Sequence, residues 1–433
     1  MGILFPLLSV LLGLVLGLAQ PVLAVQGIPA MAPVYPDYLQ RSATITTYEQ
    51  LAREKPSFLG LRLLAGEYLK RFRERMDVED LRRAETAARR SLSLQDQGNQ
   101  ASRLLLASAL LSQHRFREAL GEVELAGSSL KTGSLMASIQ MELGNYEAAQ
   151  QLLQDPPRDP SPLGQPGYQA VRAHYLELTG HLDQAQALIE QAMHSLDRFY
   201  TVPAETRAWF HGRAGDLAFA QGQAAQAERR YQEALQLYPQ AMGSLIGLSK
   251  LYAGQQRWRE ALRVAEQANQ GSPLVETLGI QADAQRALGD EKAALATEAL
   301  IEVVGHLSTV QGIYDRALAS YYSDHGIHLE KAVEIAHQEL TNRPDILAYD
   351  TYAWALAMGG DWAEAERVMQ QARRYGTQDA RLLFHAGMIA WHLGHQSEAQ
   401  RALQQALRLN PYFHPQQAAL ARQTLRSLPR FLS

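Results

Sequence analysis

The chain of 433 residues contains no cysteine. Disulfide bonds, thiolate catalysis, cysteine-based zinc sites and a lipidated N-terminal cysteine are therefore excluded. An excess of one charge sign is also missing, because 41 Lys and Arg residues stand against 45 Asp and Glu residues, for a formal net charge of −4. This balance provides no global basic field, and we expect no nucleic-acid partner.

Recognisable enzyme motifs are absent as well. The sequence has no G-x-S-x-G, G-x-x-x-x-G-K-[ST], G-x-G-x-x-G or H-E-x-x-H pattern. These patterns mark, in that order, the nucleophile elbow of α/β-hydrolases, the phosphate-binding P-loop, the dinucleotide-binding motif and the zinc-binding helix of metalloproteases. We therefore expect no enzymatic activity, no catalytic residue and no cofactor. An enzyme with an unrecognised site is kept as the third alternative for the function, after the two that are given at the end of this subsection.

The first 24 residues, MGILFPLLSVLLGLVLGLAQPVLA, carry no charged side chain. The apolar run ends with Val22, Leu23 and Ala24, at the positions that a signal peptidase recognises before its cleavage site. We interpret residues 1–24 as a secretory signal peptide, which places the protein in the periplasm or cell envelope. The alternative is an uncleaved membrane anchor over residues 3–24, because roughly 20 apolar residues can span a bilayer. Only in that case would the membrane be a partner.

A repeated pattern fills most of the remaining chain. The segments GGDWAEAERVMQQA and LGHQSEAQRALQQA begin 34 residues apart and share Gly, Glu-Ala and Gln-Gln-Ala at matching places. Alignment on the alanine of the Glu-Ala pattern gives nine anchor alanines. They are Ala119, Ala149, Ala185, Ala227, Ala261, Ala294, Ala332, Ala365 and Ala399. Their spacings run from 30 to 42 residues, and a period near 34 with helical patterning predicts a helix–turn–helix solenoid.

The residues around each anchor fit two tightly packed helices. A small residue recurs twelve positions before the anchor, as at Gly215, Ala353 and Gly387, so that the helix axes can approach closely. A glycine five positions before it ends the first helix; these glycines are Gly144, Gly180, Gly222, Gly289, Gly360 and Gly394. A proline twelve positions after the anchor stops the second helix; these prolines are Pro239, Pro273, Pro344 and Pro411.

The pattern resembles the tetratricopeptide repeat family. The segments YQEALQLYP and LQQALRLNP match the end of its second helix, and ALGD, LGNYEAA and LGHQSEA match its inter-helix turn. The resemblance covers roughly residues 60 to 412. It implies an all-α, right-handed superhelical solenoid of about nine or ten repeats that binds another protein without catalysis. The run from Leu347 to Gly394 looks like a group of exported bacterial repeat proteins without an assigned activity, which favours export.

Departures from the pattern set the expected segment boundaries. Residues 155–167 carry five prolines and are predicted to form a non-helical loop. The eighth block contains a two-residue insertion near "SYYSDHGIHLEKA", so its register stays open. The predicted segments are the signal peptide or anchor 1–24, a linker 25–45, N-terminal repeats 46–154, the loop 155–167, the main array 168–412 and a C-terminal capping helix 413–433. The charged run from Arg71 to Arg83 is interpreted as a solvated helix surface.

The partner-binding surface is derived from helical periodicity. In each first helix the core stripe occupies positions 4, 7, 8 and 11 of the repeat, so positions 2, 5, 9, 12 and 13 point the opposite way and line a concave groove. Aromatic, Met, Asp and Arg residues there favour a groove for a peptide or helix of a partner protein. The candidate groove residues are Trp209, Asp216, Phe219, Asp350, Trp354, Met358, Arg381, Phe384, Met388, Trp391 and His392. The alternative is that these rings pack against the next repeat.

Histidines raise a metal hypothesis that we do not adopt. Spacings of three and seven residues can place His385, His392 and His395 on one helical face, and "DHGIH" offers Asp324, His325 and His328 in the same way. Thirteen histidines in 433 residues produce such pairs by chance, and we assign no metal ligand. The predicted function is a non-catalytic interaction scaffold of the cell envelope. The runner-up is a periplasmic accessory protein that binds a small ligand or metal for a membrane transport or assembly system.

The uncharged run ending at Ala24 predicts cleavage before Val25. We expect N-terminal sequencing of the protein isolated from cells to begin at Val25, with the protein soluble after release from the cell envelope. Membrane-bound protein that begins at Met1 or Gly2 would support the anchor instead.

Overall fold

The computed structural model describes residues 36–127, 130–154, 164–199, 201–310 and 316–428. These residues form 22 α-helices and one short 3₁₀ helix, and no strand occurs among them. No helix in these ranges is long and apolar enough to cross a membrane. The expected signal peptide, residues 1–24, lies outside the described residues.

The helices follow one another along the whole described chain. Their bounds are η1 Asp37–Gln40, α2 Arg41–Glu54, α3 Phe58–Arg75, α4 Val78–Leu94, α5 Gln100–Ser112, α6 Phe116–Ala126, α7 Leu130–Glu142, α8 Tyr146–Leu152, α9 Gly164–Leu178, α10 Leu182–Leu196, α11 Ala204–Ala220, α12 Ala224–Leu237, α13 Met242–Gly254, α14 Trp258–Gly271, α15 Val275–Ala287, α16 Glu291–Val310, α17 Arg316–His325, α18 Leu329–Asn342, α19 Ile346–Met358, α20 Trp362–Ala372, α21 Ala380–His392, α22 Gln396–Leu409 and α23 Pro415–Ser427.

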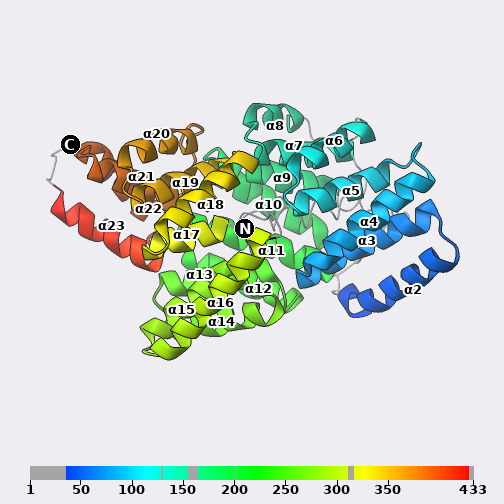
Figure 1. The fold of residues 1–433 in the computed structure, drawn as a ribbon, viewed down its shortest axis with the longest axis horizontal. Helices are drawn as coiled ribbons and strands as arrows, with labels where there is room; N and C mark the ends of the chain where they lie inside the picture. The colour runs from blue at the N-terminus through cyan, green and yellow to red at the C-terminus, as the bar shows by residue number, and fades with distance from the viewer. Residues whose placement is uncertain (1–35, 128–129, 155–163, 200, 311–315, 429–433) are drawn as a thin grey trace.

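Ten successive helix pairs build the array in the described part of the chain. They run from α3/α4 to α21/α22, with α2 before the first pair and α23 after the last (Figure 1). We number the pairs 1 to 10 in chain order. Each pair packs against the next, so the predicted all-α helix–turn–helix solenoid is confirmed.

Small residues set the distance between the two helices of a pair. All nine anchor alanines are completely buried. At Gly215 a Cβ atom would lie 2.7 Å from the ring of Tyr231, and at Gly387 it would lie 2.7 Å from Leu403. A side chain at either glycine would push the paired helices apart, because protein interiors are already close-packed.

The inter-helix turns have the left-handed backbone that the glycines predicted. Gly144, Gly180 and Gly222 have φ values of 75°, 82° and 72°. The equivalent residue is His114 in pair 2 and Gln256 in pair 6, and both keep a positive φ of about 60°. The fold therefore imposes this turn even where the residue is not glycine.

Several expected boundaries need correction. Helix α2 begins at Arg41, inside the expected linker of residues 25–45. Helix α9 begins at Gly164, so residues 164–167 of the expected proline loop are helical. Pro166 is tolerated because a first-turn N–H has no intrahelical acceptor to lose. Helix α23 occupies the expected capping segment.

The array coils back on itself, so that later pairs lie on earlier ones. In Figure 1 the yellow and orange helices lie beside the teal and green ones. The backbone N–H of Ile346 donates to the hydroxyl of Tyr146 (3.1 Å), and the hydroxyl of Thr377 donates to the carbonyl of Leu178 (2.6 Å). We call this contact between distant pairs the layer contact.

The layer contact follows a regular register. The turns of pairs 3, 4 and 5 meet the loops that follow pairs 8, 9 and 10. At Gly222 a Cβ atom would lie 2.6 Å from the carbonyl oxygen of Leu409, and at Gly144 and Gly180 it would clash with the carbonyl oxygens of Pro344 and Gly376. Glycine is needed here because another backbone occupies the space of a side chain.

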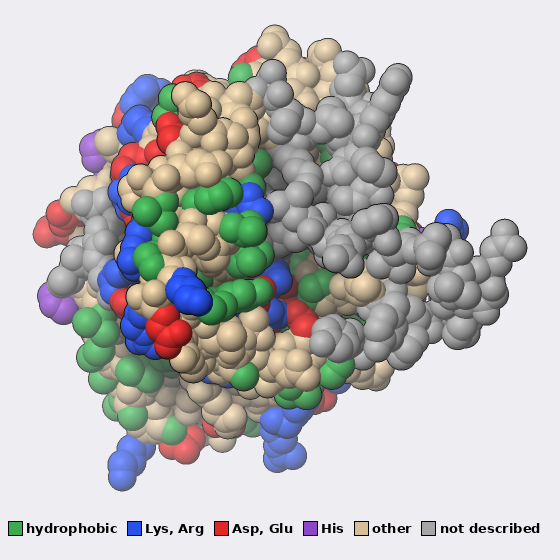
Figure 2. Space-filling model, turned by 90° about the vertical axis from the view of Figure 1, so that its right-hand side faces the viewer, with side chains coloured by type: hydrophobic (Ala, Val, Ile, Leu, Met, Phe, Trp, Pro, Cys, Tyr) green, Lys and Arg blue, Asp and Glu red, His purple; other side chains and the backbone are tan. Residues whose placement is uncertain are grey.

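Buried charges hold the layers together. Arg343 pairs with Glu142 of pair 3 and with Asp345, whose carboxylate lies 2.8 Å from its Nε. At the N-terminal end, Arg73 Nε donates to Glu205 at 3.1 Å. The run from Arg71 to Arg83 is therefore not only a solvated surface, because Arg73 is buried in the layer contact. Elsewhere, the face in Figure 2 shows Lys and Arg side chains beside Asp and Glu side chains.

Substitutions at two glycines distinguish the destabilisation that comes from the left-handed turn from the destabilisation that comes from disrupting the layer contact. Gly180 and Gly394 have nearly equal φ values of 82° and 80°, but only Gly180 faces another backbone. We expect Gly394→Ala to lower the free energy of unfolding by about 1–2 kcal/mol through left-handed strain. Gly180→Ala should cost roughly 1–3 kcal/mol more, because its Cβ is overpacked.

Urea unfolding of both variants, followed by circular dichroism, measures this difference. Equal losses for Gly180→Ala and Gly394→Ala would contradict the layer contact.

Candidate partner-binding site

The concave side of the coil encloses a cavity of about 350 Å³. The first helices of pairs 4 to 10 line it, together with the segment that joins α22 to α23. Its apolar walls come from both layers. They include Phe219, Met242, Ile246, Ile280, Leu347 and Phe413.

Charged side chains line the same cavity, with acids in excess. The seven acids are Glu177, Asp216, Glu276, Asp283, Asp324, Asp350 and Asp379, and the five Lys and Arg residues are Arg213, Lys250, Arg316, Arg343 and Arg381. Most of these bases already have carboxylate partners. Arg213, for example, lies 2.7 Å from Glu177 and 3.0 Å from Asp216. The bases are thus paired with carboxylates of the protein itself, some of them behind the wall, and an excess of carboxylate remains in the lining.

Asp350 and Asp379 carry that excess. Neither forms an ion pair with Lys or Arg among the described residues. Asp350 Oδ1 contacts His385 Nδ1 at 2.9 Å, and Asp379 Oδ1 caps α21 by accepting the N–H of Leu382 at 2.8 Å. Burial, together with the charge of Asp350, raises the pKa of Asp379. This wall of the cavity would accept a cation.

Four of the predicted groove residues line this cavity, namely Asp216, Phe219, Asp350 and Arg381. A fifth, Trp209, lines a side pocket of about 50 Å³ that shares Arg213, Asp216, Met242 and Gly243 with the cavity. Helical periodicity therefore identified the inward face of these helices correctly.

Three predicted groove residues are buried instead. Trp354 donates from Nε1 to Asp324 at 3.0 Å and stacks on His385 with ring centroids 4.4 Å apart. Phe384 and Met388 are buried in the same core, and the hydroxyl of Thr424 on α23 lies 3.7 Å from the sulfur of Met388. The coil is tight enough for these side chains to pack against the next pair or the cap, so the packing alternative is correct for them.

The remaining candidates lie away from the cavity. Met358 is half-buried at the end of α19 and does not line it. Trp391 is 37 % exposed at the end of α21. His392 stacks on Trp362 with ring centroids 3.6 Å apart. The prediction failed here because the groove face continues past the point where α21 leaves the cavity wall.

The suggested histidine clusters do not bring three ligand atoms together among the described residues. His385 lies in the core, whereas His395 is exposed and contacts Glu366 at 2.9 Å. Asp324 and His325 line the cavity, but His328 lies outside it. Within the described ranges, the set with metal-ligand spacing is Glu366, His395 and Glu398. Its Glu398 is already 2.7 Å from Arg373, and we propose no metal there.

Several wall residues were not predicted from the sequence. Glu276 occupies a groove position of α15 but was not among the residues chosen as candidates, whereas Asp379 directly precedes α21, outside the positions counted as groove. Arg316 and Arg343 belong to the eighth pair, whose register the insertion obscured. An aspartate directly before an apolar helix, as in "QDARLL", is an N-cap signal that could have pointed to Asp379.

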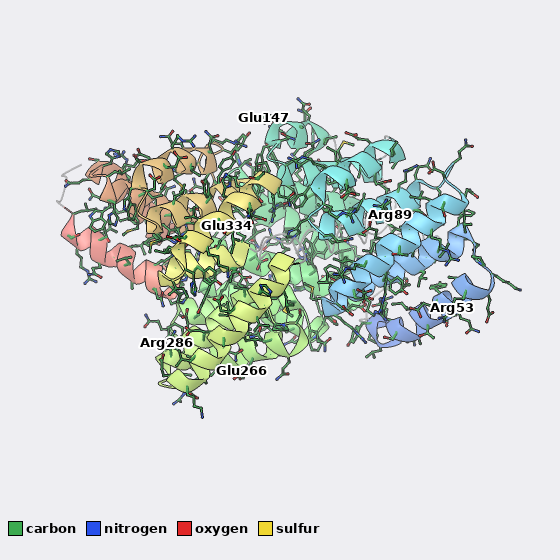
Figure 3. The ribbon with its side chains drawn as sticks, in the orientation of Figure 1. Arg53, Arg89, Glu147, Glu266, Arg286 and Glu334 are labelled. Carbon is green, nitrogen blue, oxygen red and sulfur yellow. The ribbon has the colours of Figure 1, made fainter. Side chains whose placement is uncertain are left out.

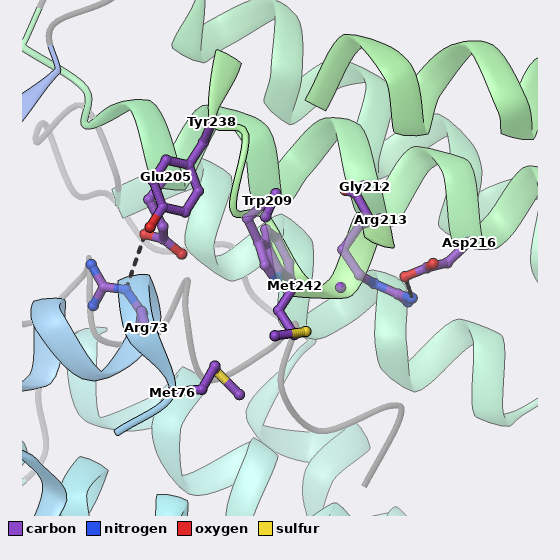
Figure 4. Close-up of a pocket in the computed structure, with 12 residues that line it drawn as sticks. Arg73, Met76, Glu205, Trp209, Gly212, Arg213, Asp216, Tyr238 and Met242 are labelled. Atoms are coloured by element: carbon purple, nitrogen blue, oxygen red, sulfur yellow. Dashed lines mark hydrogen bonds and ion pairs between the residues drawn. The ribbon is translucent and has the colours of Figure 1, made fainter. Parts of the chain in front are cut away.

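The side pocket contains two buried donors without acceptors. Figure 4 shows Arg73 bonded to Glu205 beside Trp209, Met76 and Met242. Arg73 Nη1 and Trp209 Nε1 have no hydrogen-bond partner among the described residues. The pocket has room for water, which commonly satisfies such groups.

Two stretches match family models described as tetratricopeptide repeat. One covers residues 218–273 and the other residues 380–413. With the ten packed helix pairs, these matches decide the family of the repeats.

The chain carries tetratricopeptide repeats.

Three solved structures are similar to this chain at low sequence identity. Yeast Tom70 is 12 % identical, with a TM-score of 0.35 over 90 % of this chain and 93 % of that chain. A tetratricopeptide repeat protein from Parabacteroides merdae ATCC 43184 is 17 % identical, with a TM-score of 0.33 over 60 % of this chain and 97 % of that one. The APC/C hetero-tetramer Cut9-Hcn1 is 11 % identical, with a TM-score of 0.33 over 90 % and 93 %. No curated protein matches the sequence.

Tetratricopeptide repeats are protein-interaction modules. The chain is therefore a protein-interaction scaffold, as its sequence resemblance to this family implied.

Asp324 connects the last three repeats to the cap. Its carboxylate accepts hydrogen bonds from Trp354, Arg381 and Gln417, which lie on α19, α21 and α23. Burial favours the neutral acid, but the charges of Arg381 and of nearby histidines together outweigh it and lower the pKa of Asp324. The Asp324 carboxylate thus joins pairs 8, 9 and 10 to α23.

His414 caps α23 in its neutral form. Its Nδ1 accepts the N–H groups of Gln416 and Gln417, both at 3.3 Å. Burial lowers the pKa of His414 to about 4. Protonation would remove the acceptor and add a charge near Arg381.

Acid should therefore destabilise the cap. In the unfolded chain His414 binds its proton at pH about 6.5, and in the folded chain only near 4. Its contribution is complete above pH 6.5 and is lost as the pH falls toward 4, by up to about 3 kcal/mol.

The difference between wild type and His414→Asn measures this contribution, since Asn keeps a capping acceptor without titrating. The unfolding midpoint should fall less between pH 7.5 and pH 4.5 for His414→Asn than for wild type. Equal decreases of the unfolding midpoint in wild type and in His414→Asn would show that His414 is not the titrating group.

Proposed function

We propose that the chain is a non-catalytic adaptor of the cell envelope that holds a basic segment of a partner protein inside its cavity. The observation that carries this proposal is the pair Asp350 and Asp379 in the cavity wall. Their carboxylates lack Lys and Arg partners among the described residues, whereas the cavity's own bases are paired.

The chemistry of the pair favours a Lys or Arg side chain of the partner. A cation between the two carboxylates would relieve their repulsion and favour the ionised form of Asp379, whose pKa burial raises. Charge-assisted hydrogen bonds of this kind contribute roughly 1.5–3 kcal/mol each. The apolar side chain of Leu347 lines the same wall and would contact the aliphatic stem of the cation.

The shape of the cavity favours an extended segment. The cavity lies between the inward helices of pairs 4 to 10, with lining residues from Glu177 to Pro415. An extended chain exposes its backbone and alternate side chains to both walls, which is a recurrent mode of peptide recognition. Export, predicted from residues 1–24, would place the partner in the envelope.

Model peptides test the charge preference without knowledge of the partner. We expect a hexalysine peptide to bind the purified chain and a hexaglutamate peptide not to bind, as measured by isothermal titration calorimetry. Asp379→Asn should weaken hexalysine binding about tenfold or more, equivalent to about 1.4 kcal/mol. Asp350→Asn should act in the same direction.

Glu266→Gln is the matched control, because Glu266 is an exposed carboxylate on α14 (Figure 3). Its binding should equal that of wild type. Equal binding by Asp379→Asn and Glu266→Gln, or tighter binding of hexaglutamate, would contradict the proposal.

A further inference from the structure

Helix α16 has an outer face unlike those of the other second helices. In α12, α14, α18, α20 and α22, the residues 2, 5, 6 and 9 positions after the anchor alanine are all polar or charged. On α14 they are Arg263, Glu266, Gln267 and Gln270. Glu266 and Glu334, which occupy two such positions, are labelled in Figure 3. On α16 the same four positions hold Ala296, Ala299, Leu300 and Val303.

These residues form one continuous apolar stripe. Ala296, Ala299, Leu300, Val303 and Leu307 follow the i, i+3, i+4, i+7, i+11 pattern of a single helical face. Leu300, Val303 and Leu307 are 42 %, 55 % and 53 % exposed, and Leu295 beside them is 56 % exposed. No other repeat helix in the described ranges has apolar residues at all four of the positions compared. We call Leu295, Ala296, Ala299, Leu300, Val303 and Leu307 the α16 stripe.

The stripe is separate from the proposed peptide site. Residues of α15, such as Ile280 and Asp283, line the cavity, whereas no residue of α16 does. The buried side of α16 packs through Ala294 and Ile301. Its outer side is therefore available while the cavity is occupied. Figure 1 shows α16 in the lower part of the molecule, near α14 and α15.

We propose that the α16 stripe is the interface of a two-fold dimer of this chain, in which the two α16 helices cross in antiparallel orientation. Leu300, Val303 and Leu307 of each copy pack against the stripe of the other. A two-fold interface requires a face that is complementary to itself. The stripe meets this condition because it carries no charge that would repel an identical face.

The exposed area fits a second copy. The stripe exposes roughly 400 Å² of apolar surface, within the range of functional patches on monomers. Homodimer interfaces are about 65 % apolar, so a complete interface centred on the stripe would bury about 600 Å² per copy. Two copies would then bury about 1,200 Å², the lower end of the range for stable interfaces.

The residues at the centre favour close helix packing. Ala296 and Ala299 are small, so two helix axes can approach there. Leu295 and Leu300 flank these alanines along the helix and would fill the spaces around the crossing point. The antiparallel orientation also places the N-terminus of each helix beside the C-terminus of the other, which the helix dipoles favour.

Sedimentation velocity on the purified chain tests the proposal. We expect wild type to change from monomer to dimer between about 1 and 100 μM, the affinity range of an interface of this size. Val303→Glu buries an unpaired charge in the stripe and should weaken dimerisation at least 100-fold. Gln267→Glu adds the same charge to the outer face of α14 and should leave dimerisation unchanged.

The absence of native cysteine allows a second, geometric test. In an antiparallel pair the centre of the stripe, near Leu300, meets its own copy, so Leu300→Cys should give a disulfide-linked dimer on mild oxidation. Gln267→Cys should not. Helicity by circular dichroism should match wild type for every variant, because the substituted side chains are exposed in the monomer.

A wild-type chain that stays monomeric at about 100 μM would overturn the proposal, as would a dimer unaffected by Val303→Glu. Equal cross-linking of Leu300→Cys and Gln267→Cys would overturn it as well. The peptide titrations are independent of this result, because Val303 lies outside the cavity.

Discussion

The contact between glycine turns and carbonyl groups of a distant layer is the constraint on which the structure depends. Gly144, Gly180 and Gly222 each place a bare backbone against a loop that lies nearly 200 residues later in the chain. A side chain at these turns would hold the layers apart, and the coil would open. The cavity, the buried pair of Arg343 with Glu142 and the covered rings of the last repeats all exist because the coil is closed.

Closure also changes what the concave face can recognise. An open groove would present its aromatic rings to a partner, but the closed coil uses Trp354 and Phe384 for packing. What remains inside is a polar wall in which Arg213, Arg316 and Arg381 are committed to carboxylates of the chain itself. Recognition then depends on the few groups left over, and here those are acids. Packing between repeats thus sets the charge preference of the site.

The sequence predicts everything that is local to a repeat. Anchor alanines, glycine turns and terminating prolines are short-range requirements, and each appears where the pattern placed it. Helical periodicity also identified Asp216, Asp350 and Arg381 as inward-facing. The error at Trp354, Phe384 and Met388 has a long-range cause, since no single repeat encodes how far the coil curls or where α23 returns. Asp379 was missed because a helix cap lies outside the regular positions of the repeat.

Closure of the coil bears on how the chain folds. In an open solenoid each repeat contacts only its neighbours, so ordering can begin anywhere and spread, and terminal repeats can be removed one by one. Here the hydrogen bond between Thr377 and Leu178 closes a loop of about 200 residues, and the entropy of that closure must be overcome before the contact forms. Helix pairs would assemble quickly from local contacts, and docking of the two layers would follow as a slower, cooperative step. A chain still in synthesis therefore cannot complete its cavity until the tenth pair has emerged.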